Sequence, residues 1–355
     1  MRPRRLPSSI LSLSLTFFEL SFVATFSITN NNKHRFISMS DDPQYFFVRK
    51  GTSKLAQAAV SSLDLELESW ASSSGYGTIV SSVSTGSSDW SSFHRVTTAT
   101  GGSVFVKSSS SRRSEEMFHG EALALKAMYA CSAFQYGSNN DNNEDSSSTT
   151  LRIPKVYAHG DYSNGSKGSY LIMEYLNMGG RLNDVALGKA VARMHLAPAT
   201  EESGNTINAF GFMVDNTIGG TPQPNQWTQP NSGTKEWIDF FRTHRIGHQL
   251  TLANDEYCNT IWENDINPKL HLLFDDLQIR PSLIHGDLWS GNIGSADGQP
   301  SIFDPASYWG HHEAEWGVSI YLKSIYIMIR VSIILSLSVI YILSHTLSFI
   351  RASRV

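Results

Sequence analysis

Short runs of β-branched and aromatic residues, separated by small or polar residues, dominate positions 78–173. Runs of this length joined by short turns predict strands, and consecutive runs predict an antiparallel sheet. We expect five strands, at residues 78–83, 92–97, 103–107, 156–159 and 170–173. A further apolar pattern between Asp42 and Trp70 predicts a helix before the first strand.

Helical spacing of apolar residues marks the segments around and after these strands. Ser114 is suited to cap a helix that reaches Tyr129, because two acidic residues follow it in the first turn. Helical spacing returns at residues 183–195 and 235–253. The pattern therefore predicts the α+β class: an N-terminal lobe built on a five-stranded antiparallel sheet with one helix after the third strand, followed by a mainly helical lobe.

The length of the chain agrees with two lobes, since 355 residues suit about two domains of roughly 100 to 200 residues each. We expect the sheet lobe at residues 41–176 and the helical lobe at residues 177–317. The net charge of −4 gives no sign of a basic face and excludes nucleic acid as a partner. Two cysteines are too few for a disulfide framework and favour a reducing compartment.

Residues 1–40 differ from the middle of the chain. Arginines occupy positions 2, 4 and 5, and an apolar, serine-rich stretch follows. Such an acid-poor leader is typical of an organelle transit peptide, with a plastid as one destination. The short apolar stretch also suits a secretory signal peptide, and a leader without an address would leave the protein in the cytoplasm.

Residues 318–355 form a largely apolar tail. Between Arg330 and Arg351 it carries no charged residue apart from the titratable His345. A stretch of about 20 such residues is long enough to cross a bilayer as a helix, so membrane attachment through this tail is one interpretation. Translated non-coding sequence and a buried core helix are the alternatives.

Candidate chemistry is concentrated between Ile284 and Asn292, which reads Ile-His-Gly-Asp-Leu-Trp-Ser-Gly-Asn. Phosphoryl transfer requires an acceptor hydroxyl held in line, a group that accepts its proton, and metal-bridged phosphates. Asp287 is suited to accept the proton, while Asn292 and Asp304 are spaced to bind Mg²⁺. Each residue alone would more often be a turn former, but the three together predict a kinase.

Two upstream residues extend this prediction. Lys107 ends the third predicted strand, and Glu121 lies in the helix that follows. In kinases such a lysine binds the α- and β-phosphates of ATP and a helical acid fixes it, although an isolated pair of this kind is more often a solvated ion pair. The loop at residues 84–88 is a candidate cover for the phosphates, with an ordinary hairpin turn as the alternative.

Together these residues make the chain resemble the fructosamine-3-kinase (ketosamine 3-kinase) family, within the aminoglycoside-phosphotransferase and protein-kinase-like superfamily. The resemblance runs from about Asp42 to Gly317. Its most specific motifs are Asp-Asn-Thr-Ile-Gly at 215–219 and His-Gly-Asp-Leu-Trp-Ser-Gly-Asn at 285–292. Further marks are Phe118–Leu123, Ile172–Tyr175, Gly211–Gln223, Phe303–Ala306 and Gly310–Glu315.

The resemblance implies a bilobal protein-kinase-like fold that uses ATP and Mg²⁺, with nucleotide bound by the first lobe and catalysis in the second. Asp287 would be the catalytic base, and Asn292 and Asp304 the metal ligands. Lys107 and Glu121 would form the nucleotide clamp. The residues implied to meet adenine are Glu174, Tyr175 and Leu176, and those implied to contact the sugar are Trp289 and His285.

The implied reaction is phosphorylation of the 3-hydroxyl of ribulosamine or fructosamine adducts on protein lysines, which makes the adduct decompose and deglycates the protein. The family's chain continues past Glu315 through further helices, so with the apolar tail in their place the C-terminal lobe is expected to be truncated. The alternatives are a kinase for another small sugar or an aminoglycoside, and an inactive membrane-attached pseudokinase.

Overall fold

The structure is a computed structural model that describes residues 54–111, 113–133 and 150–319. The predicted leader at residues 1–40 lies outside the described residues, as do residues 320–355 of the predicted tail. Among the helices within the described ranges, none combines the length and the apolar character needed to cross a bilayer.

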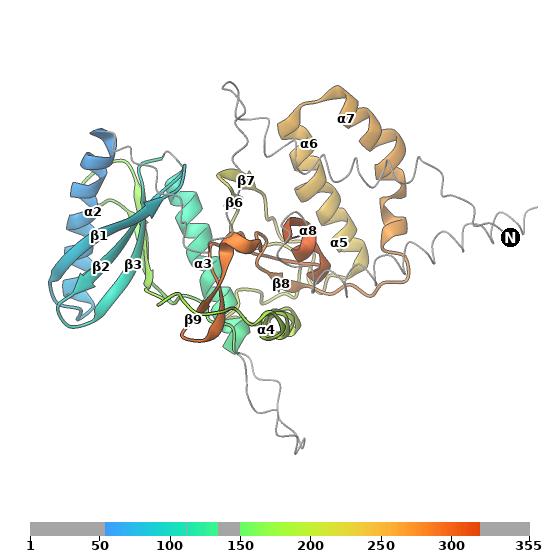
Figure 1. Ribbon diagram of the computed structural model, residues 1–355. Coiled ribbons are helices and arrows are strands. Elements are labelled where there is room, and N and C mark those ends of the chain that lie inside the picture. The colour runs from blue at the N-terminus through green and yellow to red at the C-terminus, as the bar shows by residue number, and fades with distance from the viewer. Residues whose placement is uncertain (1–53, 112, 134–149, 320–355) are drawn as a thin grey trace, which may run out of the picture.

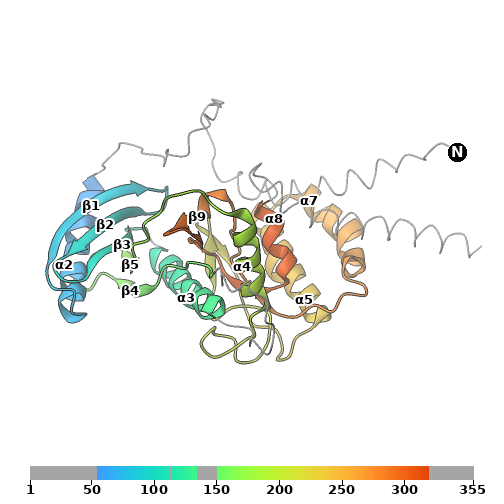
Figure 2. The same ribbon diagram turned by 60° about the horizontal axis from the view of Figure 1, so that its bottom comes forward.

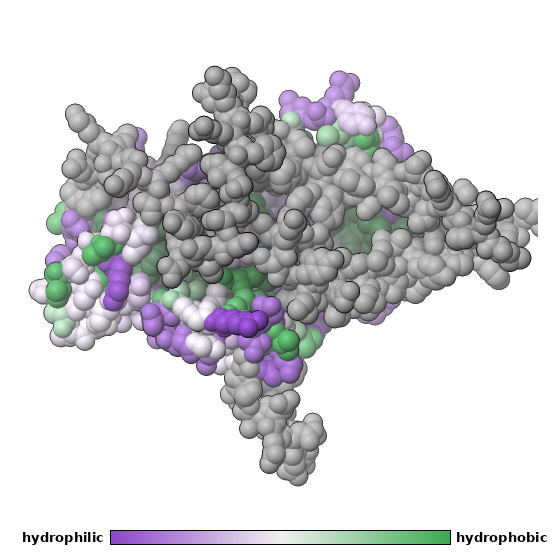
Figure 3. Space-filling view, viewed as in Figure 1, coloured by the Kyte–Doolittle hydropathy of each residue, from purple (hydrophilic) through white to green (hydrophobic). Residues whose placement is uncertain are grey.

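A five-stranded antiparallel sheet forms the first part of the molecule (Figure 1), as the sequence predicts. Its spatial order is β1-β2-β3-β5-β4, and β1 at the edge is largely exposed. On the face in Figure 3, apolar residues of this part are scattered singly among polar ones. The strands are β1 (Ile79–Ser87), β2 (Ser92–Thr98), β3 (Gly102–Ser109), β4 (Val156–Asp161) and β5 (Ser169–Glu174).

The turn between β1 and β2 lies later than predicted. Residues 84–87, which we expected in the loop, belong to β1, and the turn consists of Ser88–Ser91. The hydroxyl of Ser88 accepts hydrogen bonds from the backbone N–H groups of Trp90 and Ser91, at 3.2 and 3.1 Å. A serine that bonds its own downstream backbone stabilises a turn, so the turn follows Ser88 rather than Gly86. We call Ser88–Ser91 the phosphate loop.

One helix packs on each face of the sheet (Figure 2). Helix α2 (Lys54–Ser73) packs on the face that carries Val104 and Val106, and α3 (Ser114–Ala133) on the face that carries Phe105. Successive strand residues point to opposite faces. Lys107 therefore follows Phe105 onto the α3 face, where the helix meets the site.

The rest of the described chain is mainly helical, as predicted, with three two-stranded sheets. The predicted helix at 235–253 is α5 (Thr234–Phe240) and α6 (His248–Ala253), joined by a π-helical segment, Phe241–Gly247. The other helices are α4 (Asp184–Leu196), α7 (Glu256–Ile261) and α8 (Trp316–Ser319). The strands are β6 (Asn216–Ile218), β7 (Thr221–Gln223), β8 (Ser282–Ile284), β9 (Ile293–Ala296), β10 (Gln299–Ile302) and β11 (Tyr308–Gly310).

A single hydrophobic core joins the two parts. It contains Leu125 and Met128 of α3, Met194 of α4, Leu283 of β8 and Trp309 of β11, all fully buried. Helix α3 is thus packed on the sheet and on the helical part at once. This shared packing sets the position of α3 relative to the loop that follows β8.

Leu67 and Leu65 of α2 provide a test of the sheet packing. Leu67 is 0% exposed against the sheet, whereas Leu65 is 60% exposed. Leu67→Ala should lower the free energy of unfolding by about 2 to 5 kcal/mol, because it leaves a cavity. Leu65→Ala should change it by less than about 0.5 kcal/mol. Urea unfolding of both variants measures this, and equal effects would contradict the packing of α2.

Candidate active site

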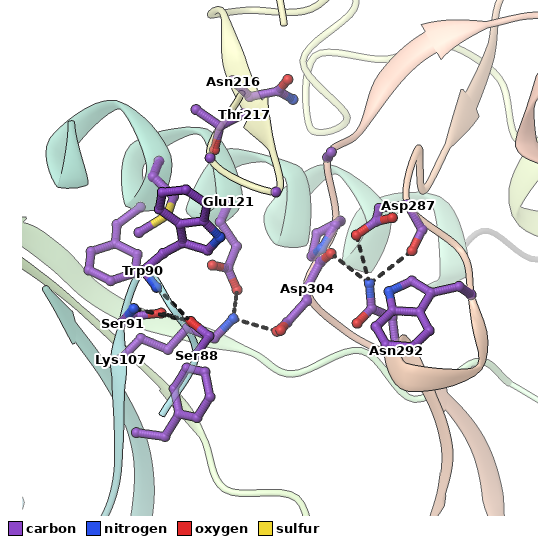
Figure 4. Close-up of a pocket in the computed structure, with 18 residues that line it drawn as sticks. Ser88, Trp90, Ser91, Lys107, Glu121, Asn216, Thr217, Asp287, Asn292 and Asp304 are labelled. Carbon is purple, nitrogen blue, oxygen red and sulfur yellow. Dashed lines mark hydrogen bonds and ion pairs between the residues drawn. The ribbon is translucent and has the colours of Figure 1, made fainter. Parts of the chain in front are cut away.

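A cavity of about 210 Å³ lies where the phosphate loop, α3, the β6–β7 hairpin and the loop after β8 meet (Figure 4). Six of the ten predicted site residues line it. They are Lys107, Glu121, Asp287, Trp289, Asn292 and Asp304. Residues from distant parts of the sequence thus converge on one cleft, as expected of a group-transfer site.

Lys107 is the only cation among the described residues that line this cavity. Its Nζ donates to Glu121 Oε1 at 2.7 Å and to Asp304 Oδ1, and its side chain is 6% exposed. Burial alone would lower the pKa of Lys107, but the negative charges of Asp304 and Glu121 raise it above its usual value. The ammonium group therefore stays charged at the wall of the cavity.

Asp287 and Asn292 form the second half of the site, on the loop after β8. The Asn292 amide donates to Asp287 O at 2.8 Å and to Asp287 Oδ2 at 3.1 Å. Burial raises the pKa of Asp287 to about 7; the Asn292 hydrogen bond opposes this rise, and the charges of Asp304 and Glu315 add to it. A carboxylate with a pKa near neutrality is well matched to accept a proton from a hydroxyl.

The carboxylate of Glu315 holds the loop that carries Asp287 through hydrogen bonds to its backbone. This buried carboxylate accepts hydrogen bonds from the backbone N–H groups of His285 (2.6 Å) and Gly286 (3.0 Å), and lies 3.1 Å from His195 Nε2. Burial would raise the pKa of Glu315, but His195, His285 and the backbone bond hold it below the usual value. Glu315 therefore remains ionised and fixes the turn before Asp287.

His285 does not fit the predicted contact with substrate. Its side chain is 0% exposed and does not line the cavity. Nδ1 accepts a hydrogen bond from the Asp287 N–H at 3.2 Å, and Nε2 lies 2.9 Å from the carbonyl oxygen of Phe303. Burial lowers the pKa of His285, so a neutral ring that donates from Nε2 satisfies both contacts. The residue braces the loop instead of facing the cavity.

The predicted hinge residues, Glu174, Tyr175 and Leu176, lie at and after the end of β5 and do not line this cavity. The Glu174 carboxylate is engaged by both guanidinium NH groups of Arg152. A carboxylate held in this way is not free to contact a ligand, so any contact with adenine would come from the backbone of this segment.

The two predicted metal ligands, Asn292 and Asp304, both line the cavity, although the described residues contain no group of three or more His, Cys, Asp or Glu side chains arranged to hold a metal ion. Three carboxylates, those of Glu121, Asp287 and Asp304, line it beside Lys107. Asn292 turns its amide nitrogen to the loop, which leaves its amide oxygen for a cation. Asp304 has a φ of 57°, a conformation that is uncommon outside glycine and that is often found at functional sites. Oxygen ligands with surplus negative charge are the set that Mg²⁺ prefers.

Several residues of this site were missed in the sequence. Trp90 and Ser91 line the cavity from the phosphate loop, and Asn216 and Thr217 line it from the β6–β7 hairpin. The motif at 215–219 includes Asn216 and Thr217, but the sequence did not predict that these residues would line the cavity. Glu315 stood at the end of another motif, and nothing in the sequence showed that it would reach His285.

Comparisons with known proteins agree with this geometry. The sequence model of the fructosamine kinase family matches residues 73–325. The chain is 41% identical over 223 residues to the "Protein-ribulosamine 3-kinase, chloroplastic" of Arabidopsis thaliana, which covers 61% of this chain and 59% of that protein. It is 31% identical over 240 residues to the mouse "Ketosamine-3-kinase", covering 61% of this chain and 69% of that protein.

A crystal structure of a fructosamine-3-kinase candidate from Haemophilus somnus is similar in fold. Its TM-score is 0.55 at 21% identity, with 77% of this chain and 79% of that chain covered. This similarity confirms the predicted kinase-like fold. The chain spans less than two thirds of the length of the Arabidopsis relative.

Glu315→Gln tests the support of the loop. The amide keeps the shape but places an NH₂ group near buried N–H donors, so we expect a loss of about 1 to 3 kcal/mol in the free energy of unfolding at neutral pH. The folded pKa of Glu315 lies below its usual 4.5. Its contribution to stability is therefore present above about pH 4.5 and is lost as the pH falls through the folded pKa.

Urea unfolding between about pH 3 and 7 measures both effects. The free energy of unfolding of the unmodified protein should fall more steeply with acid than that of Glu315→Gln. Parallel curves would show that Glu315 is not ionised in the folded protein.

Proposed function

This chain belongs to the fructosamine kinase family, and we propose that it is an ATP- and Mg²⁺-dependent ketosamine 3-kinase. The proposed acceptor is the 3-hydroxyl of a ribulosamine or fructosamine adduct on a protein lysine, and the outcome is protein deglycation. The observation that carries the proposal is the convergence of Lys107, Glu121, Asp287, Asn292 and Asp304 on one cavity.

Each residue has a chemical task in this proposal. Asp287 accepts the proton of the acceptor hydroxyl as that oxygen attacks the γ-phosphorus, the bond from the γ-phosphorus to the β–γ bridging oxygen breaks, and ADP leaves. Lys107 binds the α- and β-phosphates while Glu121 holds it. Asn292 and Asp304 would hold Mg²⁺, which when bound neutralises charge on the phosphates. Trp289, 38% exposed at the cavity, offers an aromatic face to the sugar.

The division of labour follows the two parts of the chain. We propose that residues 41–176 bind nucleotide, with the backbone of 174–176 meeting adenine because the Glu174 side chain is bonded to Arg152. Residues 177–317 would carry catalysis. The plant relatives are named protein-ribulosamine 3-kinases and chloroplastic, so we propose ribulosamines as the preferred acceptors and a plastid as the location.

Asp287→Asn tests the reaction directly. We expect the ribuloselysine-dependent consumption of ATP in the presence of Mg²⁺ to fall about 10²- to 10⁴-fold, because the general base is lost. Binding of ATP should persist. The matched control is Asp297→Asn, at the exposed turn between β9 and β10, which should keep the original rate.

Full turnover by Asp287→Asn would remove Asp287 as the base. Turnover of free sugars or an aminoglycoside in place of ribuloselysine would replace the proposed acceptor while leaving the phosphotransferase assignment intact.

Lys107→Met tests the nucleotide clamp. It removes a charged contact with phosphate that is worth about 1.5 to 3 kcal/mol, so the KM for ATP should rise about 10- to 100-fold. Lys126→Met, at an exposed position of α3, is the matched control. Steady-state kinetics with varied ATP measure both, and an unchanged KM for Lys107→Met would contradict the clamp.

A further inference from the structure

The β6–β7 hairpin, residues 216–223, has no role in the chemistry described so far. It lines the cavity opposite Lys107, through Asn216 and Thr217 on β6 and Gly219 and Gly220 in its turn. It therefore faces the phosphate loop from the other part of the molecule (Figure 4).

The base of the hairpin is bonded to the segment that follows Asp304. Asn216 Nδ2 donates to Ser307 O at 2.8 Å, and Gln223 Nε2 donates to Ala306 O at 3.1 Å and to Asn216 Oδ1 at 2.8 Å. Asn216 is 3% exposed and Gln223 7%. Buried amides are costly to leave unpaired, so these bonds fix the hairpin relative to the backbone two and three residues beyond Asp304.

The turn of the hairpin contacts the phosphate loop. A Cβ atom built on Gly220 would lie 3.0 Å from the Cδ2, Cε2 and Cε3 atoms of Trp90, so the indole rests directly on this glycine. Gly220 also has a φ of +79°, which favours glycine. Trp90 is 48% exposed, so the contact is not part of a core. Figure 4 shows Trp90 beside the hairpin at the rim of the cavity.

The contact of Trp90 with Gly220 and the hydrogen bonds at the base of the hairpin together connect the phosphate loop to the segment after Asp304. Trp90 lies at the tip of an edge hairpin whose first strand is largely exposed, and the hydrogen bonds that Ser88 accepts from Trp90 and Ser91 join residues of the loop to one another. Through Gly220 the loop meets a hairpin that is itself bonded to the backbone after Asp304.

We propose that Trp90 is a positioning residue for phosphoryl transfer, and that its indole, seated on Gly220, fixes the phosphate loop relative to Asp304. The proposal rests on the proposed kinase function. With Trp90 seated, the phosphate loop keeps a constant position relative to Asp304 across the cavity. Misplacement of a binding group by about 1 Å costs up to about 10²-fold in rate.

A double-mutant cycle of Trp90→Ala and Gly220→Ala tests this contact. Each single variant should raise the Kd of a non-hydrolysable ATP analogue with Mg²⁺, and the KM for ATP, by about tenfold, with a smaller change in kcat. The methyl group of Gly220→Ala acts by displacing the indole. In the Trp90→Ala background, Gly220→Ala should therefore raise the Kd and the KM by less than about a further twofold. Backbone strain at Gly220 is present in both backgrounds, so it cancels from the coupling between the two substitutions.

Trp90→Phe provides the rescue, since a smaller aromatic ring can still rest on Gly220 and should restore most of the nucleotide affinity. Melting temperatures of all variants, without ligand, separate these effects from unfolding. Independent, multiplicative effects of the two substitutions on Kd would overturn the proposal, as would an unchanged Kd for Trp90→Ala. Coupling in nucleotide binding without turnover of any ketosamine would support the contact and reject the proposed acceptor.

Discussion

The site depends on one buried cation. A charge as enclosed as that of Lys107 is costly unless it is paired, and its two partners come from different parts of the chain: Glu121 from α3 and Asp304 from the segment after β10. The ion pairs therefore hold β3, α3 and the segment after β10 together. The core that α3 shares with α4 and β8 packs this helix on both sides, so the charge of Lys107 has a defined place at the wall of the cavity.

Two acids at the loop after β8, the buried Glu315 and the half-buried Asp287, have opposite environments. Glu315 accepts two backbone N–H bonds and lies near His195, which keeps its pKa below the usual value. Asp287 receives only the Asn292 amide on its carboxylate and has its pKa raised to about 7. Environments that separate the pKa values of two carboxyl groups also separate their roles. Glu315 is a permanent support, and Asp287 is able to exchange a proton.

The sequence predicted what local patterns encode. The five strands, α3 and α4 were found from alternation, spacing and cap residues, and the kinase motifs named six residues that share the cavity. Features set by particular side-chain hydrogen bonds were not predicted. The turn before β2 lies later than predicted because the Ser88 hydroxyl accepts hydrogen bonds from the backbone N–H groups of Trp90 and Ser91. The family resemblance implied that His285 contacts the sugar, but its ring bonds the Asp287 N–H and the carbonyl oxygen of Phe303.

The two sides of the cavity differ in the number of hydrogen bonds that hold them and in how exposed they are. On the catalytic side, Asp304 is held in a left-handed conformation and the loop of Asp287 is bonded by His285, Asn292 and Glu315. On the nucleotide side, the phosphate loop lies at an exposed sheet edge. Rigid placement is needed where a proton and a phosphoryl group move, whereas a loop that covers phosphates must open to admit them. The contact of Trp90 with Gly220 lies at this exposed edge, whereas the hydrogen bonds that Asn216 and Gln223 donate at the base of the hairpin are buried.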